Sequence, residues 1–407
     1  MTGLTAPGAG DGSGTLTLGQ LGDDPRTAAV VAAARSRGWG VVPAADSAAD
    51  VPAGRVPWTA LLEDATCDAV VVGSDGWNPG RAEAVRTLVQ AGRTLVLAQP
   101  LDPSMLWAFE LDMIARDSGA RLLPLLTDRL HPSIADLKSA IEAALAGAGP
   151  LGPLESSRLE RTMTDRSRDT VLAALARDVD VVRVLVGDPG RVATLGAGDA
   201  DAAWATLEVG FTGAEQPPVR WQVAAGVAPG LRISLQHATG SVGVFAPDGP
   251  GTWTASPPLP TPGPFDRGAV ILDRLAAALV ARPAAPAAVP PATWPDAARA
   301  LEIAETVPRS LARGRAIDLH REEFSELATF RGTMASLGCG IVFLALVLVV
   351  LATLVAGVSR ELDWNAGKAV AGAWPAIVLA ALLMFLALQF LPLLLGPDHR
   401  QPPDSTA

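Results

Sequence analysis

Short apolar runs alternate with longer helical stretches from residue 15 to residue 127, and this alternation constrains the fold more than any other feature. Two of the short runs, VVVG and TLVLA, are apolar at every position except one threonine or glycine, as expected for strands buried on both faces. Strands that alternate with helices of roughly 10–15 residues form a doubly wound parallel sheet with right-handed connections. The expected strands are Thr15–Leu18, Gly40–Ala44, Ala69–Gly73, Thr94–Ala98 and Arg121–Leu125.

Beyond residue 150 the sequence changes to stretches with a single apolar face. In LRISLQHA, the apolar residues Leu231, Ile233 and Leu235 alternate with polar ones, which is typical of a strand with one covered face. Such strands form antiparallel sheets that are open to solvent on the other side. We therefore expect an α+β domain with an open antiparallel sheet, whose strands are Trp204–Phe211, Val219–Ala225, Leu231–Ala238 and Ser241–Ala246.

Two runs near the carboxyl end, residues 332–359 and 369–396, contain no charged side chain. Each exceeds the roughly 20 residues that a helix needs to cross a bilayer, so the sequence predicts a two-helix transmembrane hairpin in contact with membrane lipid. Arginines precede the first run and Arg400 follows the second. The positive-inside rule then predicts a multi-pass protein of the inner membrane with two spans and a large cytoplasmic amino-terminal domain.

The net charge argues against nucleic-acid binding, and the spacing of the cysteines and histidines argues against a metal site. A net charge of −10 and a pI near 5.0 oppose nucleic-acid binding, because neutralising phosphates requires a basic surface. Cys67 and Cys339 lie far apart in the sequence, and the histidines form no pair with the spacing of metal ligands. We therefore expect no disulfide framework and no metal site.

Several segments together carry a family resemblance: LTLGQLG, VVPAAD, DAVVVGS, AGRTLVLAQPL, LHPSIADLKSAIEAALAGAGPLGP, ARDVDVVRVLVGDPGRV and ARALEIAETVPRSLARGRAIDL. In order and spacing the chain resembles the Gfo/Idh/MocA oxidoreductases over nearly all of residues 15–319. The resemblance implies a Rossmann-type NAD(P)-binding domain, then an α+β domain whose open sheet mediates homo-oligomer formation. It also implies a sugar-like small molecule as ligand, and the carboxy-terminal hairpin resembles membrane-anchored versions of the family.

These observations divide the chain into domains and connecting segments. We expect a disordered start at 1–14, a Rossmann-type dinucleotide-binding-like domain at 15–127, an α+β domain at 128–319 with Pro-rich loops at 257–264 and 282–295, a juxtamembrane segment at 320–332, transmembrane helices at 333–358 and 370–396, a connector at 359–369 and a tail at 397–407.

By the resemblance, the G-x-G-x-x-G fingerprint for NAD or NADP falls on Thr17, Gly19 and Gly22, with Thr17 in place of the first glycine. Asp46 is expected at the ribose, 24 residues after Gly22. The remaining candidates for cofactor binding are Ser74 and Gln99. The sequence does not distinguish between NAD, NADP and no dinucleotide at all.

Two acidic residues beside the fingerprint leave its function open. Gly22 is followed by Asp23, Asp24 and Pro25, where Asp24 suits a helix N-cap and Pro25 suits the first helical turn. A pyrophosphate needs the same free amide groups at the start of the helix. The loop is therefore either the start of a self-capped helix or a residual dinucleotide site.

The proton-transfer residues of the family are replaced at every position that aligns. Gln99 stands at the catalytic lysine, Ala173 at an aspartate and Arg177 at the acid–base histidine. Glutamine carries no charge and arginine stays protonated, so neither is an effective general acid–base group. Arg177 and Asp180 are candidates for substrate binding.

Two hypotheses follow for the function. The first is a membrane-anchored protein with the oxidoreductase fold that is weakly active or non-catalytic and serves in ligand binding or as a scaffold. The alternative is an active NAD(P)-dependent oxidoreductase on a sugar or polyol, with Glu63, Asp75 or Asp178 as relocated acid–base groups.

Overall fold

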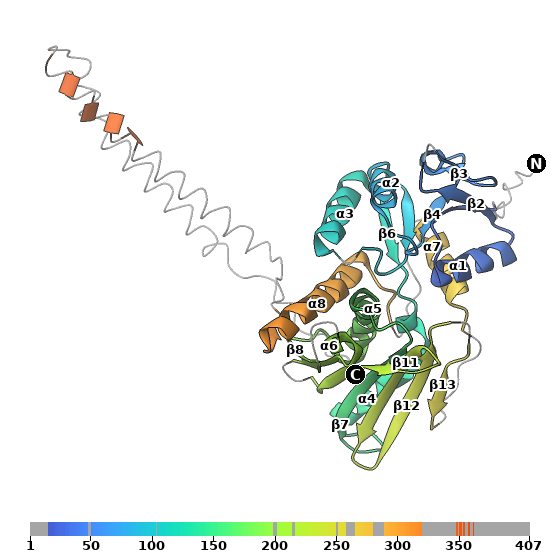
Figure 1. Ribbon diagram of the computed structural model, residues 1–407, viewed down its shortest axis with the longest axis vertical. Helices are drawn as coiled ribbons and strands as arrows, with labels where there is room; N and C mark the ends of the chain where they lie inside the picture. Colours follow the sequence, from blue (N-terminus) through green and yellow to red (C-terminus); the bar gives the residue numbers. More distant parts are fainter. Residues whose placement is uncertain are drawn as a thin grey trace, which may run out of the picture. The chain divides into compact units, whose positions relative to one another are not determined.

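The computed structural model describes residues 15–47, 50–102, 104–197, 202–213, 216–249, 251–257, 265–279 and 289–319, with isolated positions between 347 and 361 (Figure 1). The chain divides into two compact units, Met1–His320 and Arg321–Ala407. The helices and strands described below all lie in the first unit.

The first sheet has six parallel strands in the order β3-β2-β1-β4-β5-β6. Its strands are β1 (Thr17–Leu21), β2 (Gly40–Ala45), β3 (Val56–Pro57), β4 (Ala69–Val72), β5 (Thr94–Leu97) and β6 (Arg121–Pro124). The helices between them are α1 (Pro25–Ser36), α2 (Pro79–Gln90) and α3 (Met105–Ser118), with a 3-10 turn η1 at Trp58–Leu62. Every residue of β4 is buried, as its uninterrupted apolar sequence predicts. The predicted Rossmann-type sheet is confirmed.

The second sheet has eight strands in the order β13-β12-β11-β7-β10-β9-β8-β14. They are β7 (Leu154–Met163), β8 (Arg191–Leu195), β9 (Glu208–Thr212), β10 (Val219–Ala225), β11 (Gly230–His237), β12 (Gly240–Pro247), β13 (Thr254–Ser256) and β14 (Ile317–Asp318). This sheet is mixed, not purely antiparallel as predicted, because β10 pairs with β7 in parallel. Trp204, predicted in a strand, lies in the short helix α6 (Ala202–Ala205), before β9 begins.

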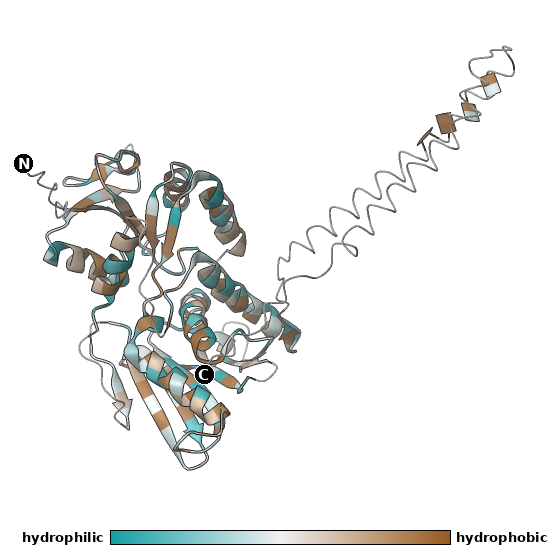
Figure 2. Cartoon of the chain, turned by 180° about the vertical axis from the view of Figure 1, so that it is seen from behind, coloured by the Kyte–Doolittle hydropathy of each residue, from teal (hydrophilic) through white to brown (hydrophobic). Residues whose placement is uncertain are grey.

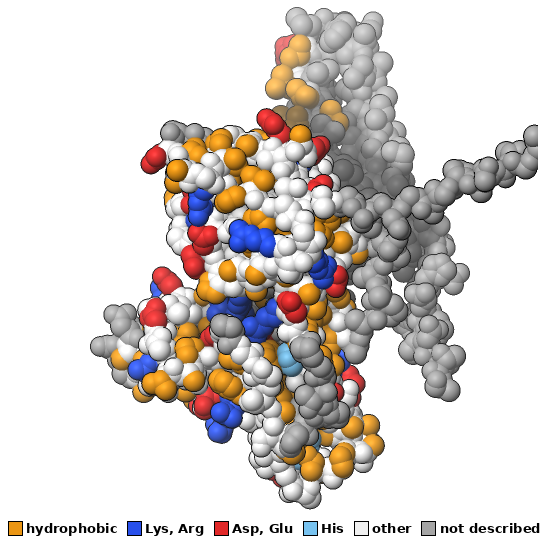
Figure 3. All heavy atoms as spheres, turned by 90° about the vertical axis from the view of Figure 1, so that its right-hand side faces the viewer, with side chains coloured by type: hydrophobic (Ala, Val, Ile, Leu, Met, Phe, Trp, Pro, Cys, Tyr) orange, Lys and Arg blue, Asp and Glu red, His pale blue; other side chains and the backbone are white. Residues whose placement is uncertain are grey.

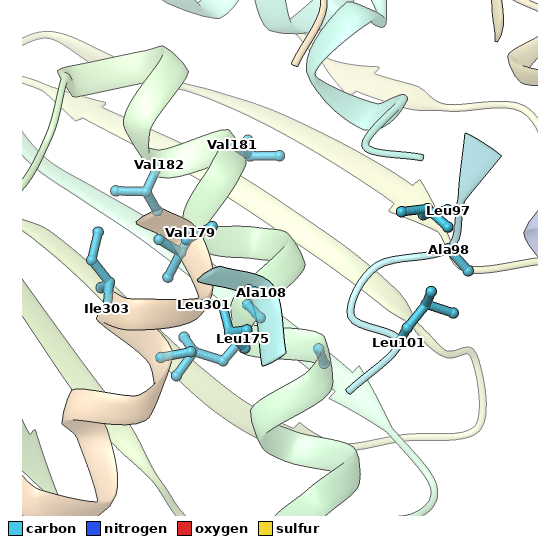
Figure 4. Packing of buried hydrophobic residues seen from close by; sticks show 14 of the residues in the cluster. Leu97, Ala98, Leu101, Ala108, Leu175, Val179, Val181, Val182, Leu301 and Ile303 are labelled. Atoms are coloured by element: carbon cyan, nitrogen blue, oxygen red, sulfur yellow. The ribbon is translucent and has the colours of Figure 1, made fainter. Parts of the chain in front are cut away.

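One face of the second sheet packs against helices and the other carries polar side chains. The buried cluster joins Leu159 of β7 and Trp221 of β10 to α5 (Arg168–Val186) and α8 (Trp294–Arg313). Figure 4 shows Leu175 and Val179 of α5 beside Leu301 and Ile303 of α8. Along the strands, brown segments alternate with paler ones in Figure 2, which is the period of a sheet with one covered face. A homo-oligomer through the other face stays a prediction.

The helix α7 (Arg267–Leu279) packs against the first sheet's layer, although its sequence lies within the predicted second domain, 128–319. Its Ile271, Leu272 and Leu275 join the buried cluster that contains Leu18 and Val30. A side chain at Gly268 would overlap the Ala29 carbonyl and lie 2.8 Å from the Ala33 Cβ. The chain therefore returns to α1 after completing β13. The helix α4 (Pro132–Leu145) follows the 3-10 turn η2 (Asp128–Leu130).

The predicted Pro-rich loop at 282–295 ends earlier than expected. The helix α8 begins at Trp294, with Thr293 as its N-cap and Asp296 completing a capping box. Residues 282–288 lie outside the described residues, as do 258–264 of the other Pro-rich loop.

The predicted two-span hairpin and inner-membrane location are wrong for the structure described. Among the residues that the structure describes, no helix is both long enough and apolar enough to cross a bilayer. The predicted spans at 333–358 and 370–396 lie outside the described residues, except for isolated positions from Val347 to Glu361. A long run without charges is necessary for a membrane span but does not by itself establish one.

We expect Gly268→Val to lower the free energy of unfolding by about 2 kcal/mol, because any side chain there must push α7 away from α1. Urea denaturation followed by tryptophan fluorescence measures this change. The control is Gly210→Ala in β9, where the nearest atom to a new Cβ is the Ala193 oxygen at 3.8 Å, and its effect should stay within about 0.5 kcal/mol. Equal effects of the two substitutions would contradict the tight packing of α7 on α1.

Candidate functional site

The strand β1 runs three residues further than predicted, which changes the position of the proposed fingerprint. Thr17 and Gly19 lie inside β1, where Gly19 pairs with Val42 and Val70. A side chain at Gly19 would lie 2.8 Å from the Leu61 Cδ2 atom, so this glycine makes room for core packing. Only Gly22, with a φ of 72°, lies in the turn that leads to α1. Thr17 and Gly19 therefore lie within the strand and not in the turn after it, and their expected role in cofactor binding stays a prediction.

Asp24 caps the amino terminus of α1, as one of the two predicted alternatives required. Its Oδ1 accepts hydrogen bonds from the amides of Arg26 at 2.7 Å and Thr27 at 3.4 Å. Its other oxygen accepts a hydrogen bond from the Ser74 hydroxyl. The amide groups that a pyrophosphate would use already have a carboxylate partner, and Ser74 holds that carboxylate in place.

Asp23 fastens the β1–α1 turn to the loop after β4. Its backbone oxygen accepts from the Asp75 amide at 2.9 Å, and the two residues form an isolated antiparallel bridge. A side chain at Gly73 would lie 2.9 Å from the Asp23 nitrogen, so the two loops are in direct contact. The Asp23 carboxylate also accepts from Gln20 at 2.9 Å and pairs with Arg55 at 3.2 Å.

Arg81, in the first turn of α2, holds the acid that was expected at the ribose. Its Nε and terminal nitrogen donate to the two oxygens of Asp46 at 2.9 and 2.7 Å. Its other terminal nitrogen donates to the backbone oxygens of Gly73 at 3.0 Å and Asp75 at 2.6 Å. Burial would raise the pKa of Asp46, but the hydrogen bonds and charge of Arg81 lower it.

The Arg81 guanidinium also fills the space next to the turn glycine. A Cβ built on Gly22 would lie 2.5 Å from the Arg81 Cζ. In a dinucleotide-binding turn, that open side of the glycine lets the backbone approach the pyrophosphate. The helix start, the ribose acid and the turn glycine each have an internal partner. The residues present therefore do not fit a dinucleotide held in the usual way in this conformation.

The positions of the family's lysine and histidine carry groups with unpaired nitrogens. The Nε2 of Gln99 and the Nε of Arg177 are both buried, and neither has a hydrogen-bond partner. Burial, together with the charges of Arg26 and Arg161, lowers the pKa of Arg177 to about 9, so it is still charged at neutral pH. Ala173, half-buried on α5, supplies no titratable group.

Asp178 and Asp180 are structural partners of buried arginines. Asp178 accepts from the Arg161 Nε and from the Trp221 Nε1, each at 2.8 Å, which joins α5 to β7 and β10. Asp180 lies 3.3 Å from the Arg129 guanidinium and is 1% exposed. Burial raises its pKa to about 7, against the charges of Arg129 and Arg183. The expected role of Asp180 in substrate binding stays a prediction.

Sequence reasoning missed Arg81, His131 and the arginines around Asp128. Asp128 lies 3.1 Å from Arg267, and four arginines, Arg26, Arg267, Arg161 and Arg177, lower its pKa although burial would raise it. His131 stacks on Trp253 with ring centroids 3.8 Å apart, and burial lowers its pKa to about 4. The sequence LHPS could have revealed one of these residues, because proline is common at the first position of a helix and the residue before it is then the N-cap. In the structure, His131 is the N-cap of α4, which begins at Pro132.

A metal site is absent from the part of the chain that the structure describes: no group of three His, Cys, Asp or Glu side chains could hold an ion.

Solved structures with the same fold are NAD(P)-dependent dehydrogenases. The WlbA dehydrogenase from Bordetella pertussis, in complex with NADH and UDP-GlcNAcA, has a TM-score of 0.56 at 17% identity over 76% of this chain and 100% of its own. A myo-inositol dehydrogenase from Corynebacterium glutamicum has a TM-score of 0.54 at 16% identity over 75% and 99%. GenD2 from gentamicin A biosynthesis, in complex with NAD, has 0.55 at 20% over 78% and 100%.

These likenesses establish the fold of the chain, and at such identities they establish the fold alone. The neighbours are dehydrogenases of the kind that the Gfo/Idh/MocA resemblance indicates. Two of them are complexes with NADH or NAD, which keeps NAD or NADP as a possible cofactor of this fold. No protein-family model matches the sequence. No curated protein matches it either.

We expect Asp24→Ala to lower the free energy of unfolding by about 1 kcal/mol, because two amides of α1 lose their acceptor. Asp24→Asn keeps a capping oxygen and should cost less than half as much. Thermal and urea unfolding of both variants measure the difference. If Asn destabilised the protein as much as Ala, the negative charge and not the cap would be what matters.

Proposed function

We propose that this protein has the dehydrogenase fold but binds a small ligand without NAD(P)-dependent catalysis. The Arg81–Asp46 pair under Gly22 is the observation that carries the proposal. To reach Asp46, a dinucleotide would have to break the two charge-assisted hydrogen bonds that Arg81 donates to it. It would also have to displace Asp24 from the start of α1. Charge-assisted hydrogen bonds are worth about 1.5–3 kcal/mol each, so these contacts compete strongly with a weakly anchored cofactor.

The residues at the positions of the family's lysine and histidine favour the same conclusion. Gln99 cannot move a proton, and Arg177 is charged at neutral pH. General acid–base catalysis contributes roughly 10²–10⁴-fold in enzymes that use it, so losing both groups removes most of the rate of alcohol oxidation. The fold supplies a ligand-binding framework, and the internal ion pairs replace the cofactor's contacts.

The alternative, an active oxidoreductase with relocated acid–base groups, has weaker support. Asp178 accepts hydrogen bonds from Arg161 and Trp221, and it would have to leave both contacts to act as a base on a ligand. Glu63 is exposed at the end of η1. Asp75 is the best remaining candidate, since burial and the charges of Asp24 and Asp23 raise its pKa.

Calorimetric titration of the full chain with NAD⁺, NADH, NADP⁺ and NADPH tests the proposal. We expect no saturable binding below about 1 mM, where working dehydrogenases are saturated. The triple variant Asp23→Gly, Asp24→Gly, Arg81→Ala frees the helix start, Asp46 and the space beside Gly22, and we expect it to gain measurable binding.

The matched control is Asp23→Gly, Asp24→Gly, Arg86→Ala. Arg86 lies on the same helix and pairs with Glu83 and Glu110, so this variant keeps the Arg81–Asp46 pair, and we expect it to bind dinucleotides more weakly than the variant that lacks Arg81. Micromolar binding of any of these dinucleotides by the parent, with oxidation of a sugar or polyol at ordinary enzymatic rates, would contradict the proposal and favour the alternative.

A further inference from the structure

We propose that Asp180 is a pH-sensitive switch, which on ionisation draws Arg129 away from Asp296 and thereby loosens the start of α8. Asp180 lies on α5, Arg129 in η2 and Asp296 in the first turn of α8. Charged side chains of both signs occur between the two sheets, and Figure 3 shows basic side chains gathered in the middle of one face with acidic ones beside them. The inference goes beyond the proposed function and does not depend on it.

The first support is that Arg129 is shared by two acids from different helices. Its Nε lies 3.3 Å from an Asp180 oxygen, and one of its terminal nitrogens donates to the Asp296 carboxylate at 3.2 Å. Arg183 of α5 lies 3.2 Å from the other Asp296 oxygen and donates to the Asp296 backbone oxygen at 2.9 Å. Asp296 also completes the capping box of α8 with Thr293. The start of α8 is therefore held by arginines from η2 and α5.

The second support is that Asp180 has no hydrogen bond that would stabilise a negative charge. Its side chain is 1% exposed, and neither of its oxygens has a hydrogen-bond partner in the part of the chain that the structure describes. The Arg129 Nε at 3.3 Å lacks one as well, so the contact between the two residues is not a hydrogen bond. A buried carboxylate without donors is costly, and the neutral acid loses much less on burial. The geometry therefore favours a protonated Asp180.

The third support is the balance of charges around Asp180. The charged side chains that act on it or on its partners come from η2, α5, α7 and α8: Arg129, Asp128, Arg183, Arg274 and Asp296. Burial is the largest effect and raises the pKa of Asp180 to about 7, against the charges of Arg129 and Arg183. Raising the pH from about 6 to about 8 therefore converts most of this acid to the carboxylate.

Ionisation changes what Asp180 requires of its neighbours. The new charge needs a donor, and Arg129 is the side chain already in contact with it. A close pair requires the guanidinium to move towards α5, which lengthens its contact with Asp296. Trp294, at the first position of α8, donates to the backbone oxygen of Ala108 on α3 at 3.1 Å. A change at the start of α8 therefore reaches the helices of the first sheet.

Infrared difference spectroscopy of the full chain, between about pH 5.5 and about pH 8.5, detects the proton directly. We expect the carbonyl band of a buried, protonated carboxyl, which disappears as the pH rises through about 7. Asp180→Asn keeps the shape of the neutral acid and should lack this band. The matched control is Asp273→Asn, which removes a carboxylate from an exposed ion pair with Arg37 and should keep it. A parent without the band, or a band unchanged in Asp180→Asn, overturns the inference.

Urea unfolding of the parent and of Asp180→Asn as a function of pH gives an independent measurement. The pKa of Asp180 is higher in the folded protein than its ordinary value of 3.8, so the folded state binds the proton more tightly. The stability that this proton provides is complete below about pH 4 and is lost as the pH rises through about 7. We expect the unfolding constant of the parent, divided by that of the variant, to rise by at most about tenfold per pH unit in this window and to level off above about pH 8. A ratio that is independent of pH overturns the inference.

Hydrogen exchange of residues 294–300, relative to that of α1, tests whether the titration reaches α8. At about pH 8 we expect these amides to exchange at least about threefold faster in the parent than in Asp180→Asn, and at about pH 5.5 equally fast in both. Comparing the proteins at one pH removes the intrinsic effect of pH on exchange, and Asp273→Asn should follow the parent throughout. If Asp180 titrates but these amides exchange alike in parent and variant at about pH 8, the switch is overturned.

Discussion

The Arg81 guanidinium is the interaction on which the site depends. It is buried, and it donates to the Asp46 carboxylate beyond β2 and to backbone oxygens of Gly73 and Asp75 beyond β4. In a parallel sheet, the loops at the carboxyl ends of neighbouring strands usually stay apart and receive a ligand between them. Here one side chain ties those loops together beside Gly22. The loops beyond β2 and β4 are thereby held together by a side chain of the protein itself.

The same principle extends to the second domain, where charges are also matched internally. Arg161 and Asp178 form a buried pair that Trp221 completes, and Arg129 lies between Asp180 and Asp296. Such pairs are costly to leave half-formed, which fixes the position of α5 against the sheet.

The fold could be predicted from the sequence because strands and helix starts are marked by residues that are neighbours in the chain, in a pattern that repeats along it. Short apolar runs predicted five of the first sheet's six strands, and the Asp24-Pro25 pair marked the start of α1. The position of Gly19 inside β1 could not be read from the sequence, since a glycine is typical of a turn but this one makes room for Leu61. The role of Arg81 was also out of reach, because its partner Asp46 lies 35 residues away and only the folded sheet brings them together.

A crystal structure determined from crystals grown with millimolar NADH tests the central claim most directly. We expect the Arg81 guanidinium to remain on both oxygens of Asp46, Asp24 to remain on the first amides of α1, and no diphosphate to be seen beside Gly22. A diphosphate bound at the start of α1, with Arg81 turned away and Asp46 on a ribose, would contradict the account.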